Sequence, residues 1–82
     1  MKKLTEIFDG IIYTLYTTEG EINKITLDDI EVPFEYVGYD DVCNEYHYNI
    51  TKPNGIVEGI IIDLDDNDDI ECFYTIQIMQ NR

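Results

Sequence analysis

The chain has 82 residues, of which 18 are acidic and five are basic, so its formal net charge at pH 7 is −13. A chain of this length makes one domain, residues 1–82, and buries about 60–65% of its unfolded surface. The hydrophobic fraction of 44% is enough for a core and argues against wholesale disorder. The acidic excess disfavours direct binding to nucleic acid or to anionic lipid, because like charges repel.

The composition favours strands over helices. Ile and Tyr are abundant, whereas Ala, the best helix former, is absent along with Ser and Trp. We therefore predict a mainly β domain: an antiparallel meander of five to six strands, curled or partly closed, with one short helix at most. An α+β fold is the alternative.

The first part of the chain leaves one choice open. Leu4, Ile7 and Phe8 are spaced for one or two turns of helix ending at Gly10, but residues 2–9 also suit the start of a strand. Residues 11–18 alternate as a strand, and a tight turn at residues 19–21 leads to its hairpin partner, residues 22–27. Ile22 and Ile25 are out of phase in that partner, which indicates a bulge.

Residues 26–41 contain mixed signals. Thr26 and Asp29 match a helix-capping pattern, which predicts a helical turn up to Ile30. Pro33 ends it, because proline forces the preceding residue into an extended conformation. Residues 34–37 form a short strand candidate closed by Gly38, and residues 39–41 are expected to be a loop.

The second half predicts three strands. Residues 45–51 alternate cleanly, and the turn Lys52-Pro53-Asn54-Gly55 joins them to residues 56–64. That next strand is apolar on both faces and should be central, while Gly59 within it suggests a bulge or a close backbone approach.

Residues 70–79 form the last predicted strand. One face of this strand is an apolar stripe that includes Cys72, so we predict that Cys72 is a small core residue. The other face is polar, so we expect the strand to lie half exposed. The stripe consists of Ile70, Cys72, Tyr74, Ile76 and Ile78.

Acidic residues recur in three groups that we predict to bind a partner. The groups are Asp28, Asp29 and Glu31; Asp40 and Asp41; and Asp63, Asp65, Asp66, Asp68, Asp69 and Glu71. Side chains on one face of a strand repeat every ~6.7 Å, the scale on which phosphates follow one another along a nucleic acid. Tyr39 is the best candidate for an exposed aromatic anchor between them.

The pattern Asp63-x-Asp65-x-Asn67-x-Asp69 resembles the start of an EF-hand loop. The resemblance breaks where that loop needs glycine, which is Asp68 here, and where it needs a bidentate Glu, which is Tyr74. The flanking segments are also strands. We therefore predict no metal site and no cofactor.

No catalytic signature is present. There is no Ser, and the single imidazole, His47, follows Cys43 by four residues. A cysteine among many carboxylates should have a raised pKa, which makes it a poor nucleophile. We expect a protein that is not an enzyme, without a signal peptide or membrane span, located in the cytoplasm with Cys43 and Cys72 as free thiols.

In size, charge and Ile/Asn/Asp/Tyr-rich composition, the chain resembles the small acidic inhibitors of host defence that phages encode. These include anti-CRISPR proteins, anti-restriction DNA mimics and uracil-DNA glycosylase inhibitors. The resemblance implies a non-enzymatic blocker of a basic nucleic-acid-binding protein, acting in the host cytoplasm. An immunity protein against a cationic nuclease toxin, and an interaction module whose acidity serves solubility, are the alternatives. An exposed edge strand would also permit a homodimer.

Overall fold

The computed structural model describes residues 1–78, and these residues form eight strands and no helix. The mainly β prediction is confirmed, with more strands than expected. The strands are β1 (Lys2–Phe8), β2 (Ile11–Thr18), β3 (Glu21–Leu27), β4 (Ile30–Val32), β5 (Phe34–Asp40), β6 (Glu45–Thr51), β7 (Val57–Leu64) and β8 (Ile70–Gln77).

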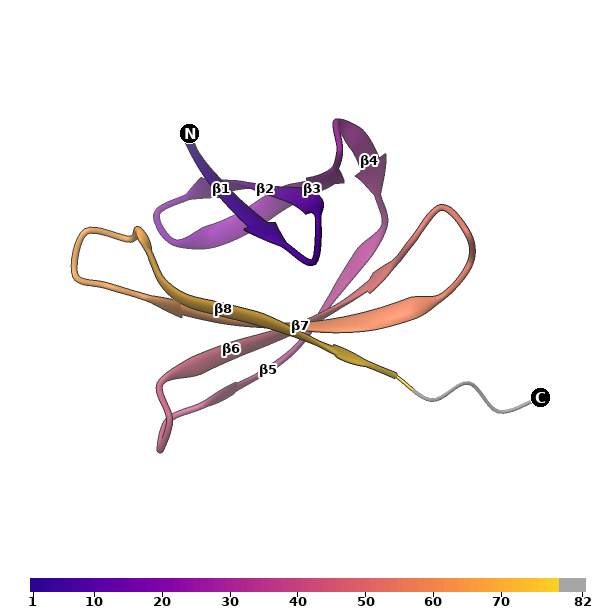
Figure 1. Ribbon diagram of the computed structural model, residues 1–82. Coiled ribbons are helices and arrows are strands. Elements are labelled where there is room, and N and C mark those ends of the chain that lie inside the picture. Colours follow the sequence, from indigo (N-terminus) through magenta and orange to yellow (C-terminus); the bar gives the residue numbers. More distant parts are fainter. Residues whose placement is uncertain (79–82) are drawn as a thin grey trace.

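The strands form two four-stranded antiparallel sheets, with the orders β1-β2-β3-β4 and β5-β6-β7-β8. Figure 1 shows the first sheet above the second, and the two do not close into a barrel. The division falls at Pro33, which lacks the N–H needed to continue the ladder. The expected single meander is therefore wrong in this respect: the chain makes one meander, crosses at Pro33, and makes a second.

Three of the hairpins turn through two residues with positive φ, as type I′ turns require. The pairs are Asp9–Gly10 (φ 55° and 80°), Glu19–Gly20 (53° and 81°) and Asp28–Asp29 (48° and 70°). The first pair makes residues 2–8 a strand rather than a helix. The third replaces the helical turn predicted at residues 26–30, and it joins Leu27 of β3 to its partner Ile30 of β4. The Asp28 amide donates a hydrogen bond of 2.9 Å to the Ile12 carbonyl, which ties the start of this turn to β2.

Three register shifts adjust which side chains face the core, and the first two lie in the β2–β3 and β5–β6 pairs. The β2–β3 register shifts after Tyr16, so that Ile22 and Ile25 are both buried, which confirms the predicted bulge. A second shift lies between Tyr36 and Gly38 in β5. It allows the strand to continue to Asp40, where the sequence predicted a loop from Tyr39 onward.

The core lies between the sheets. Its most completely buried side chains are Tyr13, Leu15, Ile25, Ile50, Ile60 and Ile62. As predicted, β7 is an inner strand of its sheet. Gly59 within it forms no bulge but makes a close approach, since an added Cβ would lie 2.9 Å from Cγ1 of Ile76.

Most of the apolar stripe predicted for β8 faces away from the core, although Ile70 at its start packs against the core. Cys72, Tyr74 and Ile76 are exposed, whereas Phe73 points inward and its ring centroid lies 5.1 Å from that of Tyr13. The prediction that Cys72 is a core residue is therefore wrong, because a register shift after Asp63 sets the phase of the strand. The end of the expected strand, Met79, lies outside the described residues.

Candidate functional site

Antiparallel pairing brings three turns to the same end of the molecule. These are the β2–β3 turn (19–20), the β5–β6 turn (41–44) and the β7–β8 turn (65–69). Figure 1 shows all three toward the left. The turns that join β1 to β2, β3 to β4 and β6 to β7 lie at the other end.

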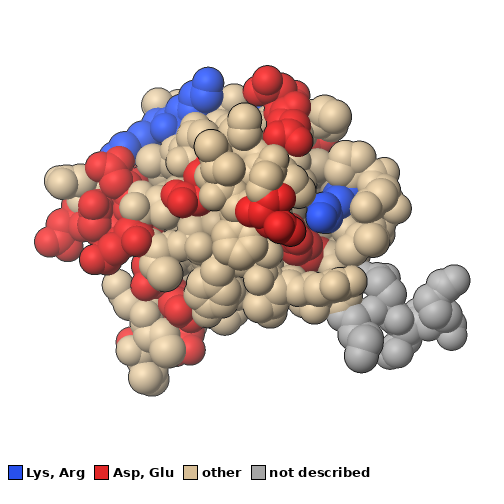
Figure 2. All heavy atoms as spheres, viewed as in Figure 1, with Lys and Arg blue, Asp and Glu red and all other residues tan. Residues whose placement is uncertain are grey.

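Most of the 18 acidic residues lie on these three turns and the strand ends beside them. We call this region the acid end. Its acidic residues are Glu19, Glu21, Asp40, Asp41, Glu45, Asp63, Asp65, Asp66, Asp68, Asp69 and Glu71. Figure 2 shows acidic atoms gathered over the left of the view, with further groups near the top and centre. The negative charge is thus concentrated without being confined to one end.

The β7–β8 turn is built around the side chain of Asp65. Its Oδ1 accepts hydrogen bonds from the amides of Asn67 (2.9 Å) and Asp69 (3.0 Å), and Asp68 has a φ of 62°. The spacing that resembles an EF-hand is therefore that of a tight hairpin turn, where Asp and Asn satisfy the backbone and tolerate left-handed φ.

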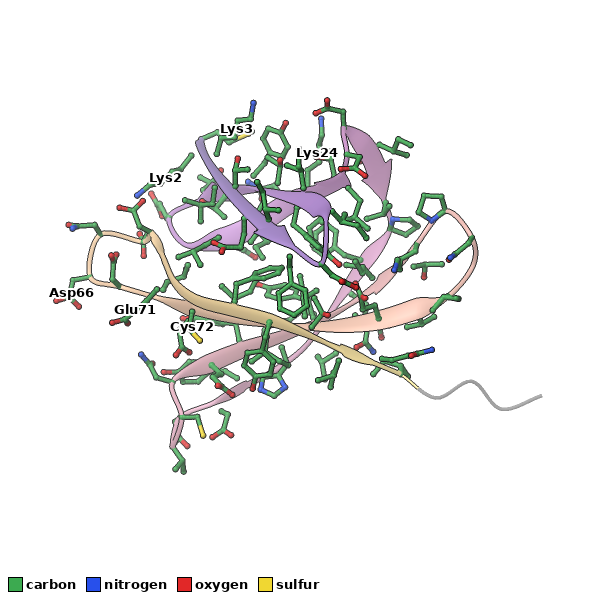
Figure 3. All side chains as sticks on the ribbon, in the orientation of Figure 1. Lys2, Lys3, Lys24, Asp66, Glu71 and Cys72 are labelled. Carbon is green, nitrogen blue, oxygen red and sulfur yellow. The ribbon has the colours of Figure 1, made fainter. Side chains whose placement is uncertain are left out.

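Within residues 1–78, one lysine makes an ion pair with the acid end. Lys2 Nζ lies 2.7 Å from Oδ1 of Asp69 and donates to the Asn67 carbonyl at 2.5 Å. Both side chains of this pair are about half exposed, so its net contribution to stability is about 0–1 kcal/mol. Lys3 and Lys24 lie on the outer face of the first sheet, on either side of the Tyr16 ring (Figure 3).

A cavity of about 520 Å³ opens between the two sheets at the acid end. We call it the cleft. It is lined by Glu19, Gly20, Glu21, Ile22, Phe34, Tyr36, Asn44, Tyr46, Tyr48, Leu64, Asp65 and Asp68. Aromatic and apolar side chains thus meet carboxylates from the turns of both sheets.

The aromatic side of the cleft is a set of packed rings on β5 and β6. The Tyr48 ring centroid lies 5.4 Å from that of Tyr36 and 6.1 Å from that of Phe34, while Tyr46 packs on Tyr39 at 4.7 Å. Burial raises the pKa of Tyr48 to about 12, and the neighbouring Tyr36 hydroxyl acts in the same direction. Tyr48 therefore keeps its proton to a higher pH than an exposed tyrosine does.

The β5–β6 turn holds one group of residues that could bind a metal. One ligand atom from each of Asp40, Cys43 and Glu45 lies within 4.8 Å of the other two. A thiolate with two carboxylates suits a borderline cation such as Zn²⁺. However, Oδ1 of Asp40 already accepts from the amides of Val42 (3.0 Å) and Cys43 (3.3 Å), as in an Asx turn.

The Cys43 thiol has the raised pKa that the sequence predicted. The Asp40 carboxylate is the largest cause, followed by desolvation and by Glu45. His47 lies beside this group on the outer face of the second sheet, with Nε2 3.7 Å from Oε1 of Glu45. The thiolate is the reactive form of cysteine, so these surroundings make Cys43 a poor nucleophile.

The structure separates the acidic groups that the sequence predicted. The groups at residues 40–41 and 63–71 meet at the acid end. Asp28, Asp29 and Glu31 lie instead on the β3–β4 turn and on β4, at the opposite end of β3. Tyr39 is 45% exposed, as expected of an anchor, but its ring rests on Tyr46 outside the residues that line the cleft.

Sequence reasoning missed Glu19 and Glu21 as site residues. Tyr48 belongs to the core cluster and Tyr46 packs against it, and both rings also line the cleft. Glu19 and Glu21 flank the glycine of a predicted hairpin, so their place on a turn was visible in the sequence. In the structure this turn lies close to Asp68, since a Cβ added at Gly20 would lie 3.4 Å from Oδ1 of Asp68. This proximity depends on how the two sheets pack, which no local sequence pattern encodes.

In comparisons with known proteins, no family model, curated sequence or solved structure matches this chain. Among residues 1–78 there is also no helix with the length and apolar character needed to cross a membrane.

Proposed function

We propose that this protein is a non-enzymatic acidic inhibitor that binds a basic nucleic-acid-binding protein and occupies its nucleic-acid site. In this proposal it acts in the cytoplasm, as an anti-CRISPR or other anti-defence protein does in the cell a phage infects. The acid end is the contact surface, and the partner is the defence effector.

The observation that carries the proposal is the grouping of carboxylates on three turns at one end. Negative groups held by a rigid sheet scaffold imitate a run of phosphates to a groove lined with Lys and Arg. Such a surface steers a basic partner and speeds its association, with a strong dependence on ionic strength. Lys3 and Lys24 lie on the outer face of the first sheet, and Lys2 pairs with only one of the carboxylates. The acid end therefore remains predominantly negative.

The test is capture of the partner from a lysate of bacteria that contain CRISPR effectors and restriction enzymes. The bound protein should be a nucleic-acid-binding enzyme, duplex DNA or guide RNA should displace it, and its activity should fall in proportion to the inhibitor added. Capture of a toxin nuclease would instead support the immunity-protein alternative. Absence of any specific partner would favour the module whose acidity serves solubility.

Two matched variants locate the contact. The acid-end variant carries Asn at Asp65, Asp66, Asp68 and Asp69. The opposite-end variant carries Asn at Asp9, Asp28 and Asp29 and Gln at Glu31. Each removes four charges, mainly from turns where Asn tolerates the observed positive φ.

The acid-end variant should lose well over tenfold in affinity for the captured protein, and the opposite-end variant should stay within about threefold. If the opposite-end variant loses more, the contact lies around Asp28 and Asp29, and the proposed site is wrong. Circular dichroism and NMR spectra of both variants should match those of the wild type.

A further inference from the structure

We infer that the cleft accommodates a single arginine side chain of the partner, with its guanidinium against the tyrosine rings and paired with the carboxylates of the rim. The inference rests on the proposed function and deepens it, because it names the chemical group that the acid end recognises. Three features of the cleft support it, namely its size, its rings and its carboxylates, and the chemistry of guanidinium matches them.

The cleft has the dimensions and the apolar walls of a ligand site. Its volume of about 520 Å³ falls within the range of about 300–1,000 Å³ that is typical of ligand pockets. Ile22 and Leu64 contribute apolar surface on opposite sheets. This surface suits the methylene stem of a long basic side chain, which packs on apolar atoms while its head remains polar.

Tyrosine rings offer an exposed face to a cation. Tyr36 is 55% exposed, although its ring packs edge-on against buried Tyr48. A cation within about 6 Å of a ring centroid is attracted by the negative face of the ring. The same contact already occurs elsewhere in this molecule, where Lys24 Nζ lies 4.9 Å from the Tyr16 centroid.

Three carboxylates that line the cleft, those of Glu19, Glu21 and Asp68, pair with no cation among residues 1–78. No hydrogen bond or ion pair engages the side chains of Glu19, Glu21 or Asp68 within the part of the chain that the structure describes. No Lys, Arg or His of that part lines the cleft either. These oxygens are therefore available to an incoming donor.

Arginine satisfies this combination better than lysine. Its planar guanidinium stacks on aromatic faces and presents a fork of N–H donors to two carboxylate oxygens, whereas the lysine ammonium is a compact and strongly hydrated charge. Carboxylates on the turns of both sheets face the cavity, so a guanidinium between them would also join the two sheets at this end.

The test is an NMR titration of the ¹⁵N-labelled protein with three blocked tripeptides: Gly-Arg-Gly, Gly-Lys-Gly and Gly-citrulline-Gly. Citrulline has nearly the shape of arginine without its charge. The arginine peptide should shift the amides of Gly20, Ile22, Tyr46 and Leu64 in a saturable way. The lysine peptide should bind at least threefold more weakly, and the citrulline peptide should produce no saturable shifts.

Paired variants separate the cleft from general attraction. Tyr36→Leu and Glu21→Gln should each weaken the arginine peptide at least fivefold. Their controls are Tyr74→Leu, on the outer face of the second sheet, and Glu31→Gln, at the opposite end; both should stay within twofold. Well-dispersed spectra will show that each variant is folded. Equal loss in the controls, or shifts spread over the β3–β4 turn, would overturn the inference.

Failure of this inference can be distinguished from failure of the proposed function. Suppose that Tyr36→Leu binds the captured partner as tightly as the wild type does, whereas the acid-end variant binds it more weakly. The cleft then receives no arginine, but the acid end is still the surface that binds the partner. If the acid-end variant also keeps full affinity, both are wrong.

Discussion

At the residue scale, two tyrosine hydroxyls show how polar groups are accommodated between the sheets. Tyr13 is 1% exposed and donates a hydrogen bond of 2.7 Å to Oε1 of Glu58, whose other oxygen lies 3.6 Å from Lys52 Nζ. Burial raises the pKa of Tyr13 first, and Glu58 then adds to the effect. Both Tyr13 and Tyr48 are consequently held in the neutral form in the folded protein.

The raised pKa values predict that stability falls in alkali. A folded pKa above the ordinary tyrosine value means that the unfolded chain releases its proton first. The stabilisation from Tyr48 is therefore complete below pH 10 and is lost as pH rises through about 12. The free energy of unfolding should fall in both proteins between pH 8.5 and pH 11. The fall in Tyr48→Phe should be about 1 kcal/mol smaller than the fall in the wild type. Urea denaturation at both pH values measures this, and an identical loss in the two proteins would contradict it.

At the element scale, the hairpins were predictable from local chemistry to the extent that glycine and proline mark them. The turns at Glu19–Gly20 and at Lys52-Pro53-Asn54-Gly55, the bulge near Ile22 and the central place of β7 follow from the sequence. Asp9–Gly10 is an equally good hairpin signal, but helical spacing of Leu4, Ile7 and Phe8 competed with it. Asp28–Asp29 has no glycine, so its turn was hidden.

The phases of the strands and the division into two sheets are less accessible to sequence. The stripe on β8 is regular, yet a bulge in its pairing with β7 exposes Cys72 and turns Phe73, which is partly buried, toward the core. The cleft is less accessible still, because it joins side chains from both sheets. Some of its carboxylates were predicted, because they lie close together in the sequence. Its aromatic wall was not predicted, because the sequence does not show which rings of the second sheet remain uncovered by the first sheet.

The β3–β4 turn predicts a stabilising substitution. Asp29 has a φ of 70°, a left-handed conformation that costs a residue with a Cβ roughly 1–2 kcal/mol and glycine much less. Asp29→Gly should therefore raise the free energy of unfolding by about 1 kcal/mol in urea denaturation. Asp29→Ala removes the same charge but keeps the Cβ, so it serves as the control. Equal stabilisation by both would mean that charge, rather than backbone strain, is responsible.

The contact between Gly59 and Ile76 predicts a coupling between β7 and β8. A Cβ at position 59 would lie 2.9 Å from Cγ1 of Ile76, closer than such atoms normally approach. Gly59→Ala should destabilise the wild type by about 1 kcal/mol but should be neutral or stabilising when Ile76 is Ala, because strands otherwise disfavour glycine. A double-mutant cycle in urea measures this coupling. Additive effects would show that the Ile76 side chain moves away freely.

At the scale of the whole molecule, the net charge of −13 acts against the compact state. Eighty-two residues supply one modest core, and most of the carboxylates lie on three turns and the strand ends beside them. Repulsion among the acid-end carboxylates therefore destabilises the fold, and the same charges attract basic groups. The scaffold tolerates much of this charge because the carboxylates of the β7–β8 turn, at Asp65, Asp66, Asp68 and Asp69, are exposed to water.

This repulsion predicts that salt stabilises the fold. Raising NaCl from 20 mM to 500 mM shortens the screening length, and the midpoint of thermal unfolding should rise by roughly 4–8 °C, or about 1 kcal/mol. The acid-end variant should show a smaller rise than the wild type, while the opposite-end variant should show an intermediate one. A midpoint that falls with added NaCl would contradict this explanation.

The concentration of negative charge at the acid end can be measured without any partner. Paramagnetic relaxation of backbone amides by a cationic nitroxide, compared with a neutral nitroxide of the same size, maps the potential at each residue. We predict the largest excess from the cationic probe at Gly20, Asn44 and Asp68, and a clearly smaller excess at Asp29. An excess at Asp29 equal to that at Asp68 would contradict the account, because the carboxylates would then act as two equivalent surfaces at opposite ends.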